Sequence, residues 1–274
     1  LRRPTRVKTQ HSKPLLPPLC PLTGADLKNT AQVFRRGVFL WACSVLHRIL
    51  CNRGLHPISL SMASLFSRHT SGFPADSTAE QQDDILAQFL KELRGCQACA
   101  HKLPLGPRPV IRISPRARLL IAGQAPGTHV HNTGIPFNDA SGERLRSWLD
   151  MRPDVFYDTE QIAIVPMALC YPGVLPKGGD KPPPPECASL WRERILSYLP
   201  NLRLTLLVGS YAQNYVLGKG KVFERVLDFR SYLPDYFPLP HPSWRTGAWE
   251  RKTPEFQNSV IPALREAVRH ALDV

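Results

Sequence analysis

Short apolar runs bounded by turn residues recur along this chain and alternate with stretches of helical periodicity. The runs cover residues 118–122, 162–165, 204–208 and 237–239. Continuous apolar runs of this length are typical of strands that are buried on both faces of a parallel sheet. The pattern therefore predicts an α/β domain, a three-layer α/β/α sandwich with a short central parallel sheet of about four strands.

Helices are expected before, between and after these strands. An amphipathic helix over 79–93 leads into Cys96. The other expected helices cover 142–149, 187–199, 211–216, 222–229 and 254–272, the last with Thr253 as N-cap and Pro254 at its first position. No internal repeat is present.

The polar and glycine-rich loops that follow the strands are expected to lie together. Gly123 follows the first strand, Cys170 lies beyond the second, Gly209 follows the third and His241 lies just beyond the fourth. Ligands of open α/β sheets bind beyond the carboxyl ends of the strands. All four loops should therefore lie at one edge of the sheet.

Four cysteines have the spacing of a thiolate site. Two residues separate Cys96 from Cys99, so both can reach one metal centre, and Cys170 and Cys187 would return through the fold to complete the site. The first pair alone would favour two small buried hydrophobes or a redox couple. The other three cysteines precede Met62, and no disulfide framework remains, so we expect a reducing compartment, the cytoplasm.

The first 61 residues differ in composition from the rest. They hold ten Lys and Arg with one acid, which is +9 of the net +13, so the remainder is only mildly basic. The apolar run at 37–46 is too short for a bilayer and too far from the start for a secretory signal, although a transit peptide would also be Arg-rich. We expect Met62 to be the natural start, 1–78 to be a disordered or non-native leader, and 79–274 to be the domain.

The order of these landmarks resembles the uracil-DNA glycosylase superfamily, especially its iron-sulfur branches, families four and five. The shared features are the C-x-x-C pair, the loop Gly123-Gln124-Ala125-Pro126-Gly127, the two later cysteines and His241-Pro242-Ser243. The resemblance covers about residues 81–274. Each loop alone is a weak signal, but together with the cysteines they are specific.

The resemblance implies roles for these residues. The 123–127 loop and Pro166 would line a pocket for a flipped base, Phe137 would stack on that base, and His241 would donate a hydrogen bond to the oxygen on which charge accumulates. Ser243, Trp244 and Arg245 would contact DNA. Cys96, Cys99, Cys170 and Cys187 would bind a structural 4Fe-4S cluster, with zinc as the alternative metal.

The first motif departs from the family pattern. The best-known branch has an Asp at the third position of the loop and family four has a Glu at the second, whereas this chain has Ala125 and Gln124. Gln124 is a site residue that cannot act as a general base. The nearest carboxylate is Asp139, which we expect to position water or to stabilise the developing cation. The alternative is that Asp139 caps a helix. Pro166 replaces the family-four Asn that reads uracil, so either base identity is read in another way or the preferred base is not uracil.

The resemblance therefore implies a monofunctional DNA glycosylase that hydrolyses the N-glycosidic bond of uracil or another deaminated base in base-excision repair. We expect a monomer whose partner is DNA and which binds no membrane. Ala125 and Pro166 motivate one alternative, a nucleic-acid-binding relative that has lost hydrolysis. A second alternative is a metal-bound α/β hydrolase that acts on a nucleotide.

Overall fold

The computed structural model describes residues 71–176 and 178–273. Its centre is a parallel four-stranded sheet in the order β2-β1-β3-β4, with β1 at Leu119–Ala122, β2 at Ile162–Ile164, β3 at Leu204–Val208 and β4 at Tyr236–Leu239. The predicted strands agree with these within one residue at each end. The apolar runs reveal them because nearly every strand residue is buried on one face or the other.

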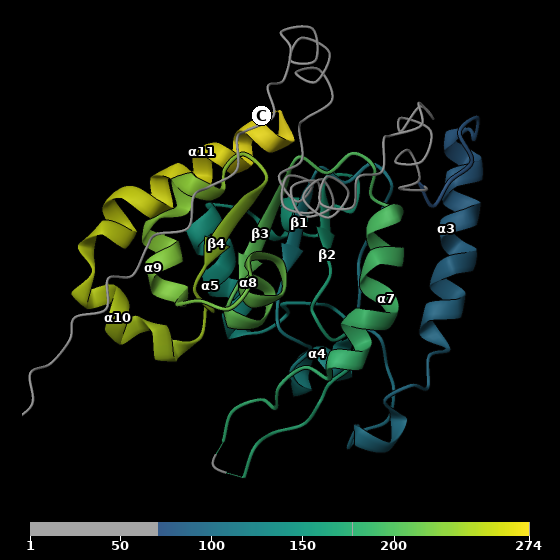
Figure 1. Cartoon of the computed structure of the whole chain (residues 1–274), viewed down its shortest axis with the longest axis horizontal. Helices are drawn as coiled ribbons and strands as arrows, with labels where there is room; N and C mark the ends of the chain where they lie inside the picture. Colours follow the sequence, from purple (N-terminus) through teal and green to yellow (C-terminus); the bar gives the residue numbers. More distant parts are fainter. Residues whose placement is uncertain (1–70, 177, 274) are drawn as a thin grey trace, which may run out of the picture. The chain divides into compact units, whose positions relative to one another are not determined.

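Two layers of helices cover the sheet, which confirms the predicted three-layer α/β/α architecture (Figure 1). One face packs against α3 (Ala79–Arg94), α7 (Pro185–Ser197) and α8 (Ser210–Leu217). The other packs against α5 (Ala140–Leu149), α9 (Val222–Leu227) and α11 (Ile261–Leu272). Residues of β1 alternate between the two cores, since Leu119 and Ile121 contact one and Leu120 contacts the other.

Short helices complete the described part of the chain. They are α4 (Thr128–Thr133), α6 (Pro153–Phe156), α10 (Gly247–Lys252), three 3₁₀ turns at Ala100–Lys102, Phe229–Tyr232 and Trp244–Thr246, and a π-turn at Phe256–Val260 that interrupts the closing helix predicted over 254–272. Among these residues no helix is both long enough and apolar enough to cross a membrane.

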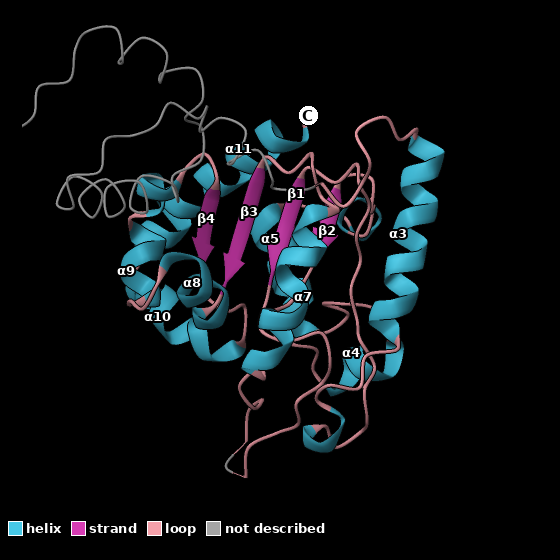
Figure 2. Ribbon diagram, turned by 45° about the vertical axis from the view of Figure 1, so that its right-hand side comes forward, coloured by secondary structure: helices cyan, strands magenta, loops and turns pink. Residues whose placement is uncertain are grey.

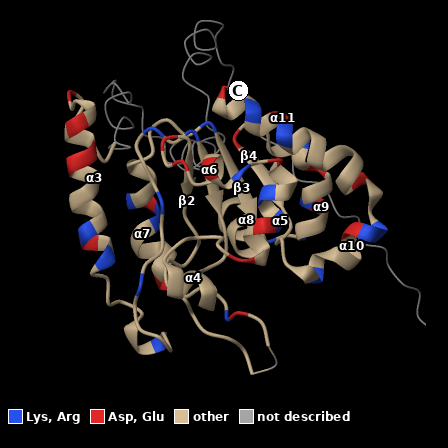
Figure 3. Cartoon of the chain, turned by 180° about the vertical axis from the view of Figure 1, so that it is seen from behind, with Lys and Arg blue, Asp and Glu red and all other residues tan. Residues whose placement is uncertain are grey.

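The strands all point toward one edge of the sheet, where α4 and a long loop between β2 and α7 lie (Figure 2). This agrees with the expected convergence of the four loops. Helix α3 carries Glu80 in its first turn and Lys91 and Arg94 in its last, a distribution that complements the helix dipole (Figure 3). It ends at Arg94, so it places Cys96 and Cys99 next to the same edge.

The predicted domain boundary at residue 79 is too late. Phe73 is only 5% exposed and its ring packs edge-on against Tyr198 at 5.2 Å. Thr78 caps α3 in a capping box with Gln81. Residues 71–78 therefore belong to the packed domain, because an aromatic side chain anchors them, whereas the expectations for 1–70, including a start at Met62, concern residues outside the described part.

Candidate functional site

Residues of the β2–α7 loop contribute to the lining of two hollows, whose empty space, partly open to solvent, is about 400 and 540 Å³. The larger hollow is a cleft at the carboxyl ends of β1 and β2. Ligand pockets of α/β sheets occupy this position. All nine residues predicted as catalytic or base-pocket residues line it, namely Gly123, Gln124, Ala125, Pro126, Gly127, Phe137, Asp139, Pro166 and His241. The structure thus brings together residues that are as far as 118 positions apart in the sequence, Gly123 and His241.

The loop after β1 forms the floor of this cleft. Its backbone is fixed from β2, because the carbonyls of Gly123 and Gln124 accept hydrogen bonds from the N–H groups of Met167 and Ala168 at 2.9 and 3.0 Å. A Cβ on Gly123 would lie 3.1 Å from the tip of the Phe137 ring. Glycine at this position therefore lets the aromatic ring approach the loop closely.

Phe137 adopts an unusual backbone conformation at the cleft. Its φ is 54°, in the left-handed region that bulky residues rarely occupy. Its carbonyl lies against the start of α5, where a Cβ on Gly142 would be 1.7 Å from the oxygen, and Arg146 Nη1 donates to the same oxygen at 3.3 Å. The ring meets Phe156 edge-on at 6.3 Å. Such over-determined strain is typical of functional sites.

Asp139 both caps a helix and lines the cleft, so the two alternatives for its position are compatible. Its Oδ1 accepts a hydrogen bond from the N–H of Gly142 at 2.8 Å, which makes Asp139 the N-cap of α5. Its Oδ2 lies 4.0 Å from the position a Cβ on Gly127 would occupy, on the side of the cleft floor. The cap fixes the orientation of the carboxylate and leaves its second oxygen for a ligand.

His241 lines the same cleft from the loop that follows β4. Burial lowers the pKa of its imidazole, and Arg245 lowers it further, while Asp139 and Asp180 act in the opposite direction. The ring packs over Gly209, with Cδ2 3.5 Å from the position of a glycine Cβ, and Thr246 Oγ1 donates to the His241 carbonyl at 2.5 Å. A neutral imidazole in this position can donate a hydrogen bond into the cleft.

Asp180 is a second carboxylate at the cleft, and sequence reasoning missed it. It lies in a hairpin-like turn in which Val174 pairs with Asp180 and the N–H of Leu175 donates to the Gly179 carbonyl at 2.8 Å. Gln124 Nε2 donates to the Lys181 carbonyl at 3.2 Å and so joins this turn to the cleft floor. The segment has no periodicity, and the Gly178-Gly179 pair before Asp180 was its one local signal.

The predicted DNA-contacting residues lie beside the cleft rather than in its lining. Trp244 is 79% exposed and Arg245 places its guanidinium 5.3 Å from the centre of the Trp244 ring. Arg245 also lies against the turn, 3.2 Å from the position of a Cβ on Gly179. Trp249, farther along the same segment, stacks on Phe223 with ring centroids 4.3 Å apart and packs against the core.

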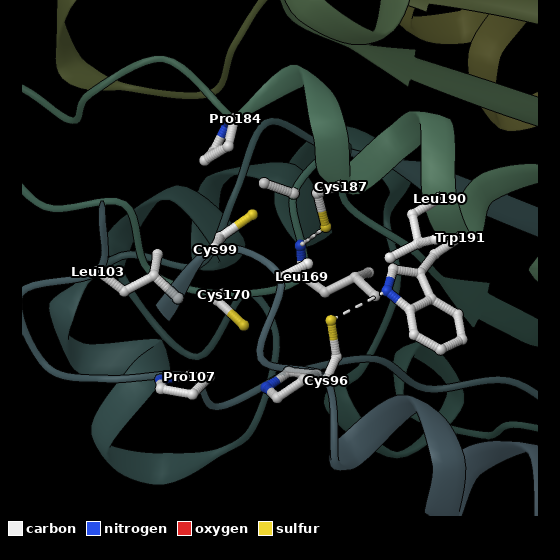
Figure 4. A pocket seen from close by; sticks show the side chains of 13 residues that line it. Cys96, Cys99, Leu103, Pro107, Leu169, Cys170, Pro184, Cys187, Leu190 and Trp191 are labelled. Atoms are coloured by element: carbon white, nitrogen blue, oxygen red, sulfur yellow. Dashed lines mark hydrogen bonds between the residues drawn. The ribbon is translucent and has the colours of Figure 1, made fainter. Parts of the chain in front are cut away.

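The four predicted metal ligands line the second, smaller hollow, which is an apolar cavity (Figure 4). Their sulfur atoms point into it from the segment after α3, from the β2–α7 loop and from the first turn of α7. Trp191 Nε1 donates to Cys96 Sγ at 3.2 Å and the N–H of Leu169 donates to Cys187 Sγ at 3.3 Å. The structure thus places Cys96, Cys99, Cys170 and Cys187 around one cavity.

These cysteines are free thiols. Burial raises the pKa of Cys170 to about 11 and that of Cys187 to about 12, and a backbone hydrogen bond from Arg108 to Cys170 acts against the first shift. Across residues 71–176 and 178–273, no three His, Cys, Asp or Glu side chains are close enough to hold a single metal ion. The sulfurs line the walls of the cavity and do not meet at one point.

The sequence profile of the uracil-DNA glycosylase superfamily matches residues 111–265, more than half of the chain. This chain belongs to the uracil-DNA glycosylase superfamily. The matched segment contains the whole lining of the larger cleft except Val110, together with Cys170 and Cys187. Cys96 and Cys99 precede the matched segment, so the match does not test whether the chain belongs to the iron-sulfur branch, which stays a prediction.

The fold is also similar to a solution NMR structure of a candidate uracil DNA glycosylase from Methanosarcina acetivorans. The two chains share 18% sequence identity, and the match covers 57% of this chain and 93% of the other with a TM-score of 0.33. Membership of the superfamily rests on the sequence profile, and the geometry of the cleft stands on its own.

Proposed function

We propose that this chain is a monofunctional DNA glycosylase that hydrolyses the N-glycosidic bond of a deaminated base, such as uracil, in base-excision repair. The observation that carries the proposal is the shared cleft of Asp139, His241 and Phe137. Superfamily membership supports DNA as the substrate. A base must leave the helical stack to reach such a cleft.

The cleft residues can divide the reaction between them. As the bond from the sugar C1′ to the base breaks, its electron pair moves onto the base, and the imidazole N–H of His241 stabilises the resulting negative charge. A water molecule oriented by Asp139 Oδ2 attacks C1′ and loses its proton to the carboxylate. The negative charge of Asp139 also stabilises the cationic sugar, and the Phe137 ring stacks on the departing base.

The polar groups of the cleft restrict how the base can be read. Pro166 lines the cleft and has neither a backbone N–H nor a polar side chain, so it reads no base edge through a donated hydrogen bond. Besides Asp139, which we assign to the water, and Ser141, the polar side chains of the lining are Gln124, Asp180 and His241, and a carboxylate such as Asp180 accepts from the N–H groups of a base. We therefore assign recognition of the base to these three residues and propose deaminated bases as the class of substrate.

We further propose that Cys96, Cys99, Cys170 and Cys187 bind a 4Fe-4S cluster. The fit is supported by four thiols on the walls of one apolar cavity, and by N–H donors to the sulfurs of Cys96 and Cys187, which are the contacts that stabilise cluster thiolates. When bound, the cluster would cross-link the end of α3 to the β2–α7 loop that carries Asp180. Its role is structural, because hydrolysis transfers no electrons.

The proposal is tested with duplex oligonucleotides that contain uracil, hypoxanthine or xanthine, followed by alkaline cleavage at abasic sites. Excision that is lost in His241→Ala, but not in a matched substitution of exposed His270, supports the assignment. Binding without excision of any of these bases would favour the alternative that Ala125 motivates, a DNA-binding relative that has lost hydrolysis. Efficient hydrolysis of free nucleotides alone would favour the nucleotide hydrolase.

A further inference from the structure

Arg144, in the second turn of α5, joins this helix to the segment that carries His241 and Trp244. Its Nη1 donates to the carbonyl of Ser243 at 3.0 Å, and its Nη2 lies 2.7 Å from Glu250 Oε1 in α10. The contact with Glu250 is a charge pair without an aligned hydrogen bond. One side chain therefore holds the segment at two points, seven residues apart.

This ion pair is more buried than the others. The side chains of Arg144 and Glu250 are 27% and 11% exposed, whereas in each other ion pair of the described residues both side chains are at least 38% exposed. The guanidinium also lies 5.6 Å from the centre of the Trp148 ring. Burial reduces screening by salt, and loss of one partner leaves the other charge unpaired.

Arg144 lies in the helix that Asp139 caps, so its contact with Ser243 connects the two parts of the chain that carry Asp139 and His241. Asp139 is the N-cap of the same helix, so the orientation of its carboxylate follows that of α5. Ser243 is two residues after His241 and directly precedes Trp244. The Arg144 side chain thus spans from the helix that orients one proposed catalytic group to the loop that bears the other.

We propose that Arg144 is a positioning residue that sets the separation of Asp139 and His241 across the cleft and fixes Trp244 outward, with Glu250 as its charge partner. The inference rests on the proposed glycosylase function. Positioning errors on the ångström scale reduce rates strongly, because the reacting groups must meet in one geometry.

The test compares Arg144→Met with Arg265→Met. Arg265 is a matched control, since its Nε and Nη2 donate to the carbonyls of Trp148 and Ser147 at 3.0 and 3.1 Å, at the far end of the same helix. We expect Arg144→Met to lower single-turnover excision by about 10- to 100-fold, and Arg265→Met by less than about 2-fold. Thermal unfolding of both variants separates this effect from lost stability.

A double-mutant cycle distinguishes positioning from general weakening. If Arg144 acts through the His241 loop, Arg144→Met should lower excision by less than about 3-fold in a His241→Ala background, because both changes disable one element. An undiminished effect in that background contradicts the proposal, and so do equal losses in the Arg144 and Arg265 variants.

Milder variants cover the case in which Arg144→Met does not fold. Arg144→Lys carries one nitrogen that cannot serve Ser243 and Glu250 together, and Glu250→Gln removes the charge, so each should reduce excision by about 3- to 10-fold. Wild-type rates in both variants overturn the proposal.

Failure of the proposed function is recognised separately, by a wild-type protein that excises none of the three bases. Arg144 is then judged on affinity for an abasic-site duplex. Weaker binding by Arg144→Met than by Arg265→Met supports the positioning of Trp244, and equal affinities reject it.

Discussion

The carboxylate of Asp139 accepts a hydrogen bond from the N–H of Gly142 at 2.8 Å, and this contact begins α5 at the edge of the cleft. Gly142 is also the residue whose missing side chain makes room for the Phe137 carbonyl. The same short segment therefore orients the proposed catalytic carboxylate and the proposed stacking ring. Helix initiation and site geometry have one structural origin here.

Asparagine at position 139 separates these two roles. Asn is as good an N-cap as Asp, so Asp139→Asn should change the free energy of unfolding by less than about 0.5 kcal/mol, whereas Asp139→Ala should cost about 1 kcal/mol. Both variants lose the negative charge, and both should lower single-turnover excision by about 10²- to 10³-fold. Urea titration and rapid-quench kinetics measure the two effects. Full excision by Asp139→Asn would show that the carboxylate only caps the helix.

The buried imidazole of His241 predicts a dependence of stability on pH. Its pKa in the folded state is below the ordinary value of 6.5, mainly because of burial. Above pH 6.5 both states are neutral at this site and nothing is lost, but as the pH falls below 6.5 the unfolded state takes up a proton first, and stability declines. Unfolding of wild type and His241→Asn between pH 8 and 5 should converge toward acid. Parallel curves would mean that the imidazole does not titrate this way.

The exposed ring of Trp244 should contribute to DNA binding and little to folding. At 79% exposure it contacts little of the protein. Trp244→Ala should leave the melting temperature within about 1 °C, yet weaken binding to an abasic-site duplex by about 10-fold, as stacking on bases contributes about 1–3 kcal/mol. Fluorescence anisotropy measures the affinity. Trp249→Ala is the converse control. Because Trp249 packs on Phe223, this substitution should lower stability.

Phe73 makes the position of a truncation decisive. Removal of residues 1–61 should leave the fold and the melting temperature intact, because the four strands and the helices that cover them all lie within residues 79–272. Removal of residues 1–78 also deletes Phe73 and the Thr78 cap, and should cost several kcal/mol, of which Phe73→Ala alone accounts for about 3 kcal/mol. Circular dichroism melts of both truncations test this. Equal stability would show that the segment contributes nothing.

The regular parts of this fold could be predicted from sequence because their signals are local. Strands such as Leu204–Val208 are buried on both faces and read as apolar runs, and the loops that follow them meet at one edge by topology. Phe73 was placed outside the domain because an isolated aromatic residue has no periodicity, and its burial depends on a partner far along the chain, Tyr198.

Some residues of the site could likewise be predicted from the sequence, and others could not. The order of the motifs predicted that His241 and Asp139 lie at one site, because each belongs to a loop with a recognisable sequence, and both line the cleft. Asp180 and Arg144 were not foreseen. Asp180 reaches the cleft through the turn at 174–180, and Arg144 matters because of contacts to Ser243 and Glu250, about 100 residues away. Long-range polar contacts leave no pattern in a single sequence.

The cysteine cavity gives the last prediction. Anaerobically purified protein should be brown, with about four iron and four sulfide per chain, and Cys99→Ser should lose both metal and solubility. Ala98→Ser is the matched control, since Ala98 lines the same cavity without a sulfur and should retain iron. Trp191→Phe removes the N–H donor to Cys96 Sγ and should keep the iron but lower the reduction potential, because N–H donors stabilise the more negative reduced state. Colourless protein with stoichiometric zinc would show that these four cysteines bind zinc and not iron. Full metal content in Cys99→Ser would reject this ligand set.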